Sequence, residues 1–180
     1  MVTRVRIALP TTVLALAMLA GAAPAGAHAA AKNPTPAQIK AAIQKAERSK
    51  SLWATVNVCT STSKLDTIGI RGQMPTLGFP AWLSMSIQLD YYSAAKKKFL
   101  PVTKGGQKLV RVGRVSTGLQ QDGALYTFKP ASELVNASVT FIWKRSGNLL
   151  GQTTRTTTAG HPNADFGVPA HYSAQQCKIH

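Results

Sequence analysis

The stretch Ala81-Trp-Leu-Ser-Met-Ser-Ile-Gln-Leu-Asp-Tyr-Tyr92 has a period of two along its whole length. Every second residue from Ala81 to Tyr91 is apolar, and serine, glutamine and aspartate fill most of the positions between them. Successive side chains of a strand point to opposite faces of a sheet, so this pattern predicts a strand with one buried face. It is the clearest strand pattern in the chain and favours a mainly β fold.

Weaker patterns of the same kind lie on both sides of this stretch. The other predicted strands cover residues 52–59, 68–74, 99–102, 108–115, 124–128, 138–144, 149–157 and 174–179. Turn-forming residues separate them, and Gly147-Asn148 predicts a hairpin. About eight or nine short strands at this spacing predict an antiparallel β-sandwich.

One short amphipathic helix is expected before the strands. Thr35-Pro-Ala-Gln38 has the pattern of a capping box with proline at the first helical position. Ile39, Ala42, Ile43 and Ala46 follow at helical spacing, and the helix should end near residues 49–51. Because its apolar stripe is narrow, the helix either lies across the main domain or frays.

The N-terminal residues have the order of a secretory signal peptide. A positive segment ending at Arg6 precedes the apolar run Val13–Ala20, and Ala25-Gly-Ala27 offers a small-residue cleavage site. The alternative, a membrane anchor, needs about 20 predominantly apolar residues. We therefore predict a signal peptide at 1–27, a leader and helix at 28–51, and a β domain at 52–180. The protein should be secreted, with no integral membrane anchor after cleavage.

The chain has two cysteines, Cys59 and Cys177. In an oxidising compartment an even count most simply predicts one disulfide, here between the first and last predicted strands. The alternative, a metal ligand or nucleophile, has no Cys-x-x-Cys or other signature to support it. Cys59 shares its parity with Asn57 rather than with Val56 and Val58, so a bulge or an edge position is expected there.

Four segments resemble immunoglobulin-like domains of uncharacterised proteins secreted by high-GC, actinobacterial-type bacteria. They are Leu52–Cys59, Thr140–Leu150, Thr153–Thr158 and Tyr172–Cys177. The resemblance implies an immunoglobulin-like sandwich over roughly 52–179, and it supplies no catalytic or binding residues. The cysteines are more widely separated than in true immunoglobulin domains, and Trp82 lies too far beyond Cys59 to be their usual core tryptophan.

The charge is strongly one-sided, with 21 Lys and Arg against 6 Asp and Glu. Such a balance favours anionic partners, and outside a cell these are wall or other extracellular polymers rather than a specific nucleic acid. The candidate polyanion-binding residues are Lys96, Lys97, Lys98, Lys108, Arg111 and Arg114. The alternative for the lysine run is a solvated hairpin tip that protects a sheet edge. Lys144 and Arg145 extend a basic face only if the strand order allows it.

Two further features leave alternatives open. Phe79 and Trp82 either form an exposed contact or close the end of the sandwich core. His161, Asp165 and His171 are weak candidates for a metal site or for a hydrolase centre, and the alternative is a turn in which Asn163 and Asp165 cap backbone amides.

No catalytic motif and no cofactor motif is present in the sequence, since the six carboxylates form no spaced pair and there is no nucleophile elbow. The favoured hypothesis is a secreted, non-catalytic binding or structural module at the cell surface. The alternatives are a secreted hydrolase with its site near His161–His171, and a subunit of an extracellular assembly that uses free strand edges.

Overall fold

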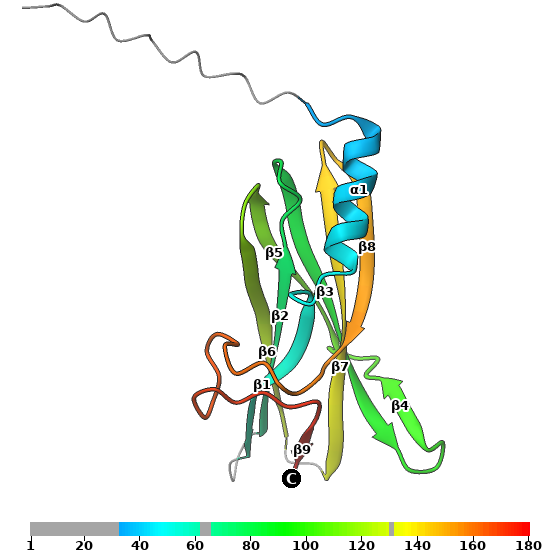
Figure 1. Cartoon of the computed structure of the whole chain (residues 1–180). Coiled ribbons are helices and arrows are strands. Elements are labelled where there is room, and N and C mark those ends of the chain that lie inside the picture. Colours follow the sequence, from blue (N-terminus) through cyan, green and yellow to red (C-terminus); the bar gives the residue numbers. More distant parts are fainter. Residues whose placement is uncertain (1–32, 62–65, 130–131) are drawn as a thin grey trace, which may run out of the picture. The chain divides into compact units, whose positions relative to one another are not determined.

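The computed structural model describes residues 33–61, 66–129 and 132–180, and within them the fold is mainly β and antiparallel, as predicted (Figure 1). The predicted signal peptide at 1–27 lies outside the described residues. The elements are α1 (Pro36–Glu47), β1 (Trp53–Ser61), β2 (Asp66–Pro75), β3 (Ala81–Ser93), β4 (Lys98–Pro101), β5 (Gln107–Val115), β6 (Leu119–Phe128), β7 (Glu133–Arg145), β8 (Asn148–Thr156) and β9 (Cys177–Ile179).

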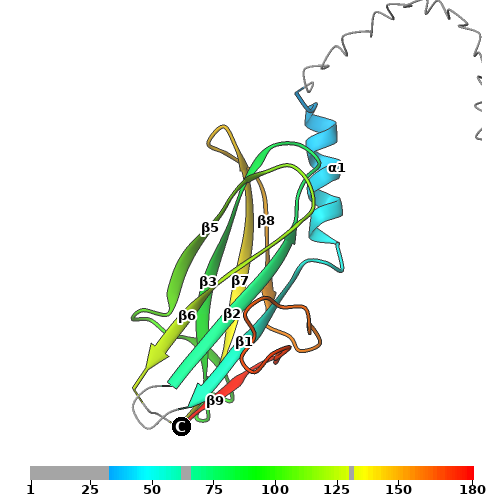
Figure 2. The same ribbon diagram turned by 90° about the vertical axis from the view of Figure 1, so that its left-hand side faces the viewer.

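The strands form two sheets that pack face to face as a sandwich (Figure 2). The small sheet has the order β1-β2-β6. The large sheet has the order β4-β3-β7-β8, with β5 also paired to β3 and β9 to β7. All of these pairs are antiparallel. The central strands of the large sheet, β3 and β7, are its longest elements with 13 residues each.

The core lies between the inner faces of the two sheets, where the period of two places the apolar residues. The alternating residues of β3 from Ala81 to Leu89 are at most 2% exposed, so the strand pattern is confirmed. Trp143 of β7 is fully buried, and its indole Nε1 donates a hydrogen bond to the Pro75 carbonyl at 3.0 Å. The small sheet contributes Ile68, Ile70 and Met74 to the same cluster.

A bulge in β1 turns Cys59 toward the core. Val56 pairs with Ile70 and Val58 with Gly69, so Asn57 is the extra residue on its strand. Beyond the bulge Cys59 lies opposite Ile68. The predicted bulge is confirmed, and so is the disulfide: Cys59 is bonded to Cys177 of β9, with a Cα–Cα distance of 5.6 Å. The bond links the small sheet to the large one.

Helix α1 begins with the predicted capping box. The backbone N–H of Thr35 donates to Gln38 Oε1 at 2.8 Å, and that of Gln38 donates to Thr35 Oγ1 at 3.3 Å. Ile43 and Ala46 are buried, so the helix packs on the domain along β8 instead of fraying (Figure 1). No helix in the described residues is long and apolar enough to cross a membrane.

The segment 157–176 leaves β8 and covers the outer edge of β1 (Figure 2). Ala174 exchanges two backbone hydrogen bonds with Val56, at 2.9 and 3.0 Å. The predicted strand at 174–179 is therefore shorter, because Ala174 pairs with the small sheet while only Cys177–Ile179 pairs with β7. The segment occupies hydrogen-bonding groups that β1 would otherwise expose as a free edge.

Candidate functional site

The outer face of the large sheet carries side chains in rows across the strands. Trp82 of β3 pairs with Arg114 of β5 on one side and with Lys144 of β7 on the other, and Lys144 pairs with Leu149 of β8. Neighbouring strands lie about 4.8 Å apart, so this row spans roughly 14 Å. Arg111 of β5 belongs to the next row. We call Trp82, Arg111, Arg114, Lys144 and Leu149 the Trp82 surface.

A bulge in β5 brings Arg111 and Arg114 to the same face. Residues three positions apart in a regular strand point to opposite faces. Here Leu83 pairs with Gly113 and Ser84 pairs with Arg111, so the register shifts by one residue between the two arginines. Gly113 adopts a φ of 127°, a conformation that side chains rarely allow. The glycine thus permits the bulge that places both guanidinium groups beside Trp82.

Trp82 is 56% exposed and stands between two hollows of the surface. One hollow, of about 350 Å³, is lined by Trp82, Arg114 and Arg145 among others. The other, of about 470 Å³, is lined by Trp82, Arg111 and Lys144 among others. Each hollow therefore brings Trp82 together with two cationic side chains.

Phe79 differs from Trp82 in its position. Its ring packs partly buried against the core, and the Arg145 guanidinium lies 5.5 Å from its centre. Of the two aromatic residues, Phe79 closes the end of the core and Trp82 forms the exposed surface.

Carboxylates lie away from the Trp82 surface. Asp90 belongs to β3, but it lies near the other end of the strand, roughly 26 Å from Trp82 along the chain. Burial raises the pKa of Asp90, and a hydrogen bond from Ser138 Oγ at 3.0 Å opposes that rise. The other five acidic residues are Glu47 at the end of α1, Glu133 at the start of β7, Asp66 and Asp122 in the small sheet, and Asp165 in the segment 157–176.

The structure does not bring the other predicted polyanion-binding residues to this surface. The Nζ of Lys108 donates to the Leu125 carbonyl of β6 at 2.6 Å and lies 4.4 Å from the centre of the Tyr126 ring. Burial raises the pKa of Tyr126 to about 12. Lys96 and Lys97 lie in the turn between β3 and β4, and Lys98 begins β4, all at the opposite end of β3 from Trp82 (Figure 1).

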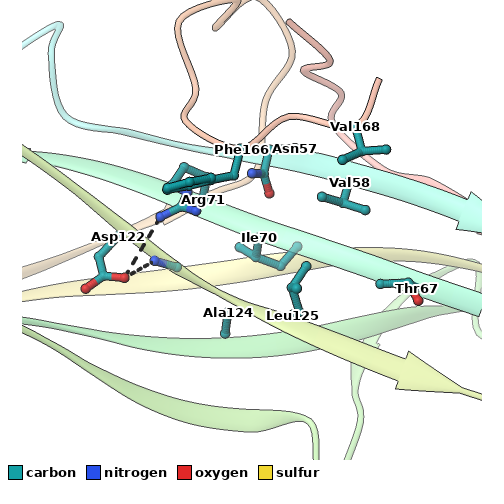
Figure 3. A pocket seen from close by; sticks show the side chains of 11 residues that line it. Asn57, Val58, Thr67, Ile70, Arg71, Asp122, Ala124, Leu125, Phe166 and Val168 are labelled. Atoms are coloured by element: carbon teal, nitrogen blue, oxygen red, sulfur yellow. Dashed lines mark hydrogen bonds and ion pairs between the residues drawn. The ribbon is translucent and has the colours of Figure 1, made fainter. Parts of the chain in front are cut away.

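The outer face of the small sheet carries a pocket of about 630 Å³ (Figure 3). Its floor comes from the three strands of the sheet, and Phe166 and Val168 of the segment 157–176 form one wall. Arg71 of β2 lies beneath the Phe166 ring, 5.0 Å from its centre, and its Nη1 is 3.9 Å from Asp122 Oδ1. Burial lowers the pKa of Arg71, while Asp122 and Asp165 oppose that shift.

The three weak metal candidates make separate contacts. The His161 ring stacks on Trp53 at 4.5 Å, and its Nε2 pairs with the Thr158 hydroxyl at 2.9 Å. His171 Nδ1 donates to the Pro162 carbonyl at 3.0 Å. Asp165 is held through its backbone, because its N–H donates to Gln121 Oε1 at 3.0 Å. Over the described ranges, no group of three or more His, Cys, Asp and Glu residues is arranged to hold a metal ion.

Comparison with known proteins gives structural likeness only. No protein family and no curated protein sequence matches the chain. Among solved structures, a glycosyl hydrolase family 2 member from Bacteroides cellulosilyticus is 8% identical over 63% of this chain, with a TM-score of 0.37. A putative β-galactosidase from Bacteroides fragilis is 11% identical over 61% of this chain, with a TM-score of 0.33. The β-glucuronidase 2 of Bacteroides uniformis is 15% identical over 61%, with a TM-score of 0.35.

This chain spans 15%, 17% and 13% of the lengths of those three proteins. At TM-scores below 0.5, the likeness carries no information about activity.

Two groupings of residues were not predicted from the sequence, although Arg111, Arg114 and Trp82 were each named as candidates separately. The Trp82 surface had a signal, because Trp82 shares its parity with Ser84 and Ser86 on the polar face of the strand. No sequence pattern predicted that Arg71 and Phe166 lie together. They are 95 positions apart in the chain, and only the path of the segment 157–176 across the small sheet brings them together.

Proposed function

We propose that this protein is a non-catalytic module that binds a polyanionic glycan outside the cell through the Trp82 surface. The observation that carries the proposal is an exposed indole flanked across the strands by Arg114 and Lys144 on an open sheet face. A polymer of acidic sugar rings matches both features. Its rings stack on the indole, while its carboxylate or sulfate groups bind the cations on either side.

Charge and shape both support an extended ligand. Cations that neutralise the charges of a polymer release its counterions, which gives binding that weakens with salt. An aromatic ring adds a contact that salt affects little, because stacking does not depend on net charge. The rows of the Trp82 surface run across several strands, so consecutive units of a polymer could occupy consecutive hollows.

The location outside the cell rests on the sequence pattern of residues 1–27 and on the disulfide. Disulfides persist in oxidising compartments and are rare in the cytosol of most organisms. A secreted basic protein meets acidic polysaccharides there, which is why we favour a glycan over a nucleic acid.

The test measures binding of the purified protein to polygalacturonate across a salt series. We expect Trp82→Ala to weaken binding about tenfold, the range seen when an aromatic stacking platform is removed. The triple variant Arg111→Gln/Arg114→Gln/Lys144→Gln should weaken binding further and flatten its salt dependence. Polyphosphate, which carries charge without rings, should bind more weakly and be insensitive to Trp82→Ala.

A matched control separates a site from net charge alone. Lys96→Gln/Lys97→Gln/Lys98→Gln removes the same number of positive charges from the far end of β3, and it should retain most of the binding. Equal losses in the two triple variants would exclude a defined site. Tighter binding to single-stranded DNA than to polygalacturonate would replace the glycan with a nucleic acid.

A further inference from the structure

We propose that the pocket on the outer face of the small sheet binds a small neutral molecule that has an apolar ring body and one hydroxyl or amide group. This site lies on the opposite face of the sandwich from the Trp82 surface, and it does not depend on the proposed function. We call it the Phe166 pocket, and it is lined by residues of β1, β2, β6 and the segment 157–176.

The Phe166 pocket holds apolar groups that the core does not use. Phe166 is 80% exposed, Leu125 58% and Val168 48%, and all three line the pocket (Figure 3). Phe166 also has a φ of 57°, a left-handed conformation that is uncommon for a bulky residue. Strained residues of this kind occur preferentially at binding sites. A volume of about 630 Å³ falls within the range of small-molecule pockets.

The wall that carries Phe166 is fixed to the sheet on two sides. Asn57, the bulged residue of β1, is buried; its Nδ2 donates to the Asp165 carbonyl at 2.7 Å, and its own carbonyl accepts from the Val168 N–H at 2.8 Å. On β6, Gln121 Oε1 accepts from the Asp165 N–H at 3.0 Å. The pocket is therefore formed before any ligand arrives, which lowers the entropic cost of binding.

A glycine in the floor of the pocket allows β2 and β6 to approach each other closely. Gly123 lies opposite Arg71 in the β2–β6 register, and a Cβ added there would collide with the carbonyl oxygen of Ile70. Val58 of β1 lies on the outer face of the same sheet and adds an apolar side chain to this floor (Figure 3).

The polar end of the pocket indicates a neutral ligand. Arg71 lines the pocket with a side chain that is 14% exposed, so its guanidinium can donate to an oxygen of the ligand. Asp122, close to that guanidinium, offers a carboxylate that can accept a hydrogen bond. The Arg71 guanidinium and the Asp122 carboxylate, which both line the pocket, carry opposite unit charges, with Nη1 and Oδ1 3.9 Å apart. A charged group of either sign is therefore attracted by one partner of this pair and repelled by the other, whereas a hydroxyl or amide supplies both an acceptor and a donor.

The experiment uses four probes that share one ring system: 2-naphthol, naphthalene, 2-naphthoate and 2-naphthylmethylamine. We expect 2-naphthol to bind at submillimolar concentration and at least three times more tightly than each of the others. In NMR titrations it should shift the Nε–H resonance of Arg71. Tighter binding of the naphthoate or the amine would overturn the neutral assignment, and no binding of any probe would overturn the pocket.

Two variants test the site itself. Phe166→Asn removes the ring and suits the left-handed backbone, so it should keep the fold and weaken both 2-naphthol and naphthalene at least fivefold. Arg71→Gln should weaken 2-naphthol but leave naphthalene nearly unchanged. Leu119→Asn, which removes another half-exposed apolar residue of the same sheet outside the pocket, should affect neither. Unchanged 2-naphthol binding in the first two variants would place the ligand elsewhere and exclude this proposal.

Discussion

The two outer faces of the sandwich differ in whether another segment covers them and in the charges that they carry. The large sheet leaves its outer face bare around Trp82, and the charged residues there are cations. The outer face of the small sheet is partly covered by the segment 157–176, and Asp122 and Asp165 lie there beside the half-buried Arg71. The first face suits an extended anionic polymer, and the second suits a small molecule.

Bulges account for much of the contrast. The carbonyl of Asn57, the bulged residue of β1, accepts a hydrogen bond from Val168 of the segment 157–176, which also pairs with Val56 along the edge of the sheet. The bulge beside Gly113 in β5 instead turns a second arginine outward on an uncovered face. A β-bulge thus accompanies the covering segment on the small sheet and the cationic surface on the large sheet.

The largest expected effect comes from removing the disulfide. This change tests whether the disulfide stabilises the two outer faces to different degrees. For a bond that spans 118 residues, the chain-entropy model predicts a loss of about 5 kcal/mol in the free energy of unfolding for Cys59→Ser/Cys177→Ser. Because Cys177 directly follows the segment 157–176, hydrogen exchange should rise most in that segment and around the Phe166 pocket. Denaturant unfolding and exchange mass spectrometry measure the two quantities.

The Trp82 surface should keep its protection in the same experiment, because it lies at the other end of the large sheet from β9. An equal rise in exchange on both faces would show that the disulfide holds the domain as a whole and that the contrast does not extend to local stability.

The sequence predicts the fold much better than the sites. The period of two in β3, the capping box of α1 and the parity of Cys59 were sufficient for the sandwich, the helix and the bulge, because each depends on neighbouring residues. The polyanion residues were proposed as one group, yet Lys108 contacts β6 and Lys96 lies at a distant turn. Such grouping depends on strand order and bulges, which a single sequence does not reveal.

The next effect concerns Gly113→Val, which tests the origin of the cationic face. A side chain is unfavourable at a φ of 127°, so we expect a loss of about 1–3 kcal/mol in stability. If the bulge rearranges, Arg111 and Arg114 no longer flank Trp82 together, and polygalacturonate binding should fall severalfold. Gly105→Val is the matched control: Gly105 also has a positive φ, of 74°, but lies in the turn before β5. Equal losses of binding in both variants would mean that strain alone lowers affinity.

The smallest expected effect is a pH dependence of stability that arises at the outer face of the small sheet and not at the Trp82 surface. Burial lowers the pKa of His161, which stacks on Trp53 on the outer face of the small sheet. The ordinary histidine pKa of about 6.5 applies to the unfolded chain, so that chain binds this proton more readily than the folded one. The contribution of His161 to stability is therefore complete above pH 6.5 and declines as the pH falls through that value.

Urea unfolding from pH 7.5 to pH 5 should show this decline in the wild type and a shallower one in His161→Asn. Polygalacturonate binding to the large sheet should not respond to the substitution at either pH, because His161 belongs to the other face. If His161→Asn changed polymer binding at pH 5 but not at pH 7.5, the protonated imidazole would be part of the polymer site. The division between a polymer-binding face and a small-molecule face would then fail.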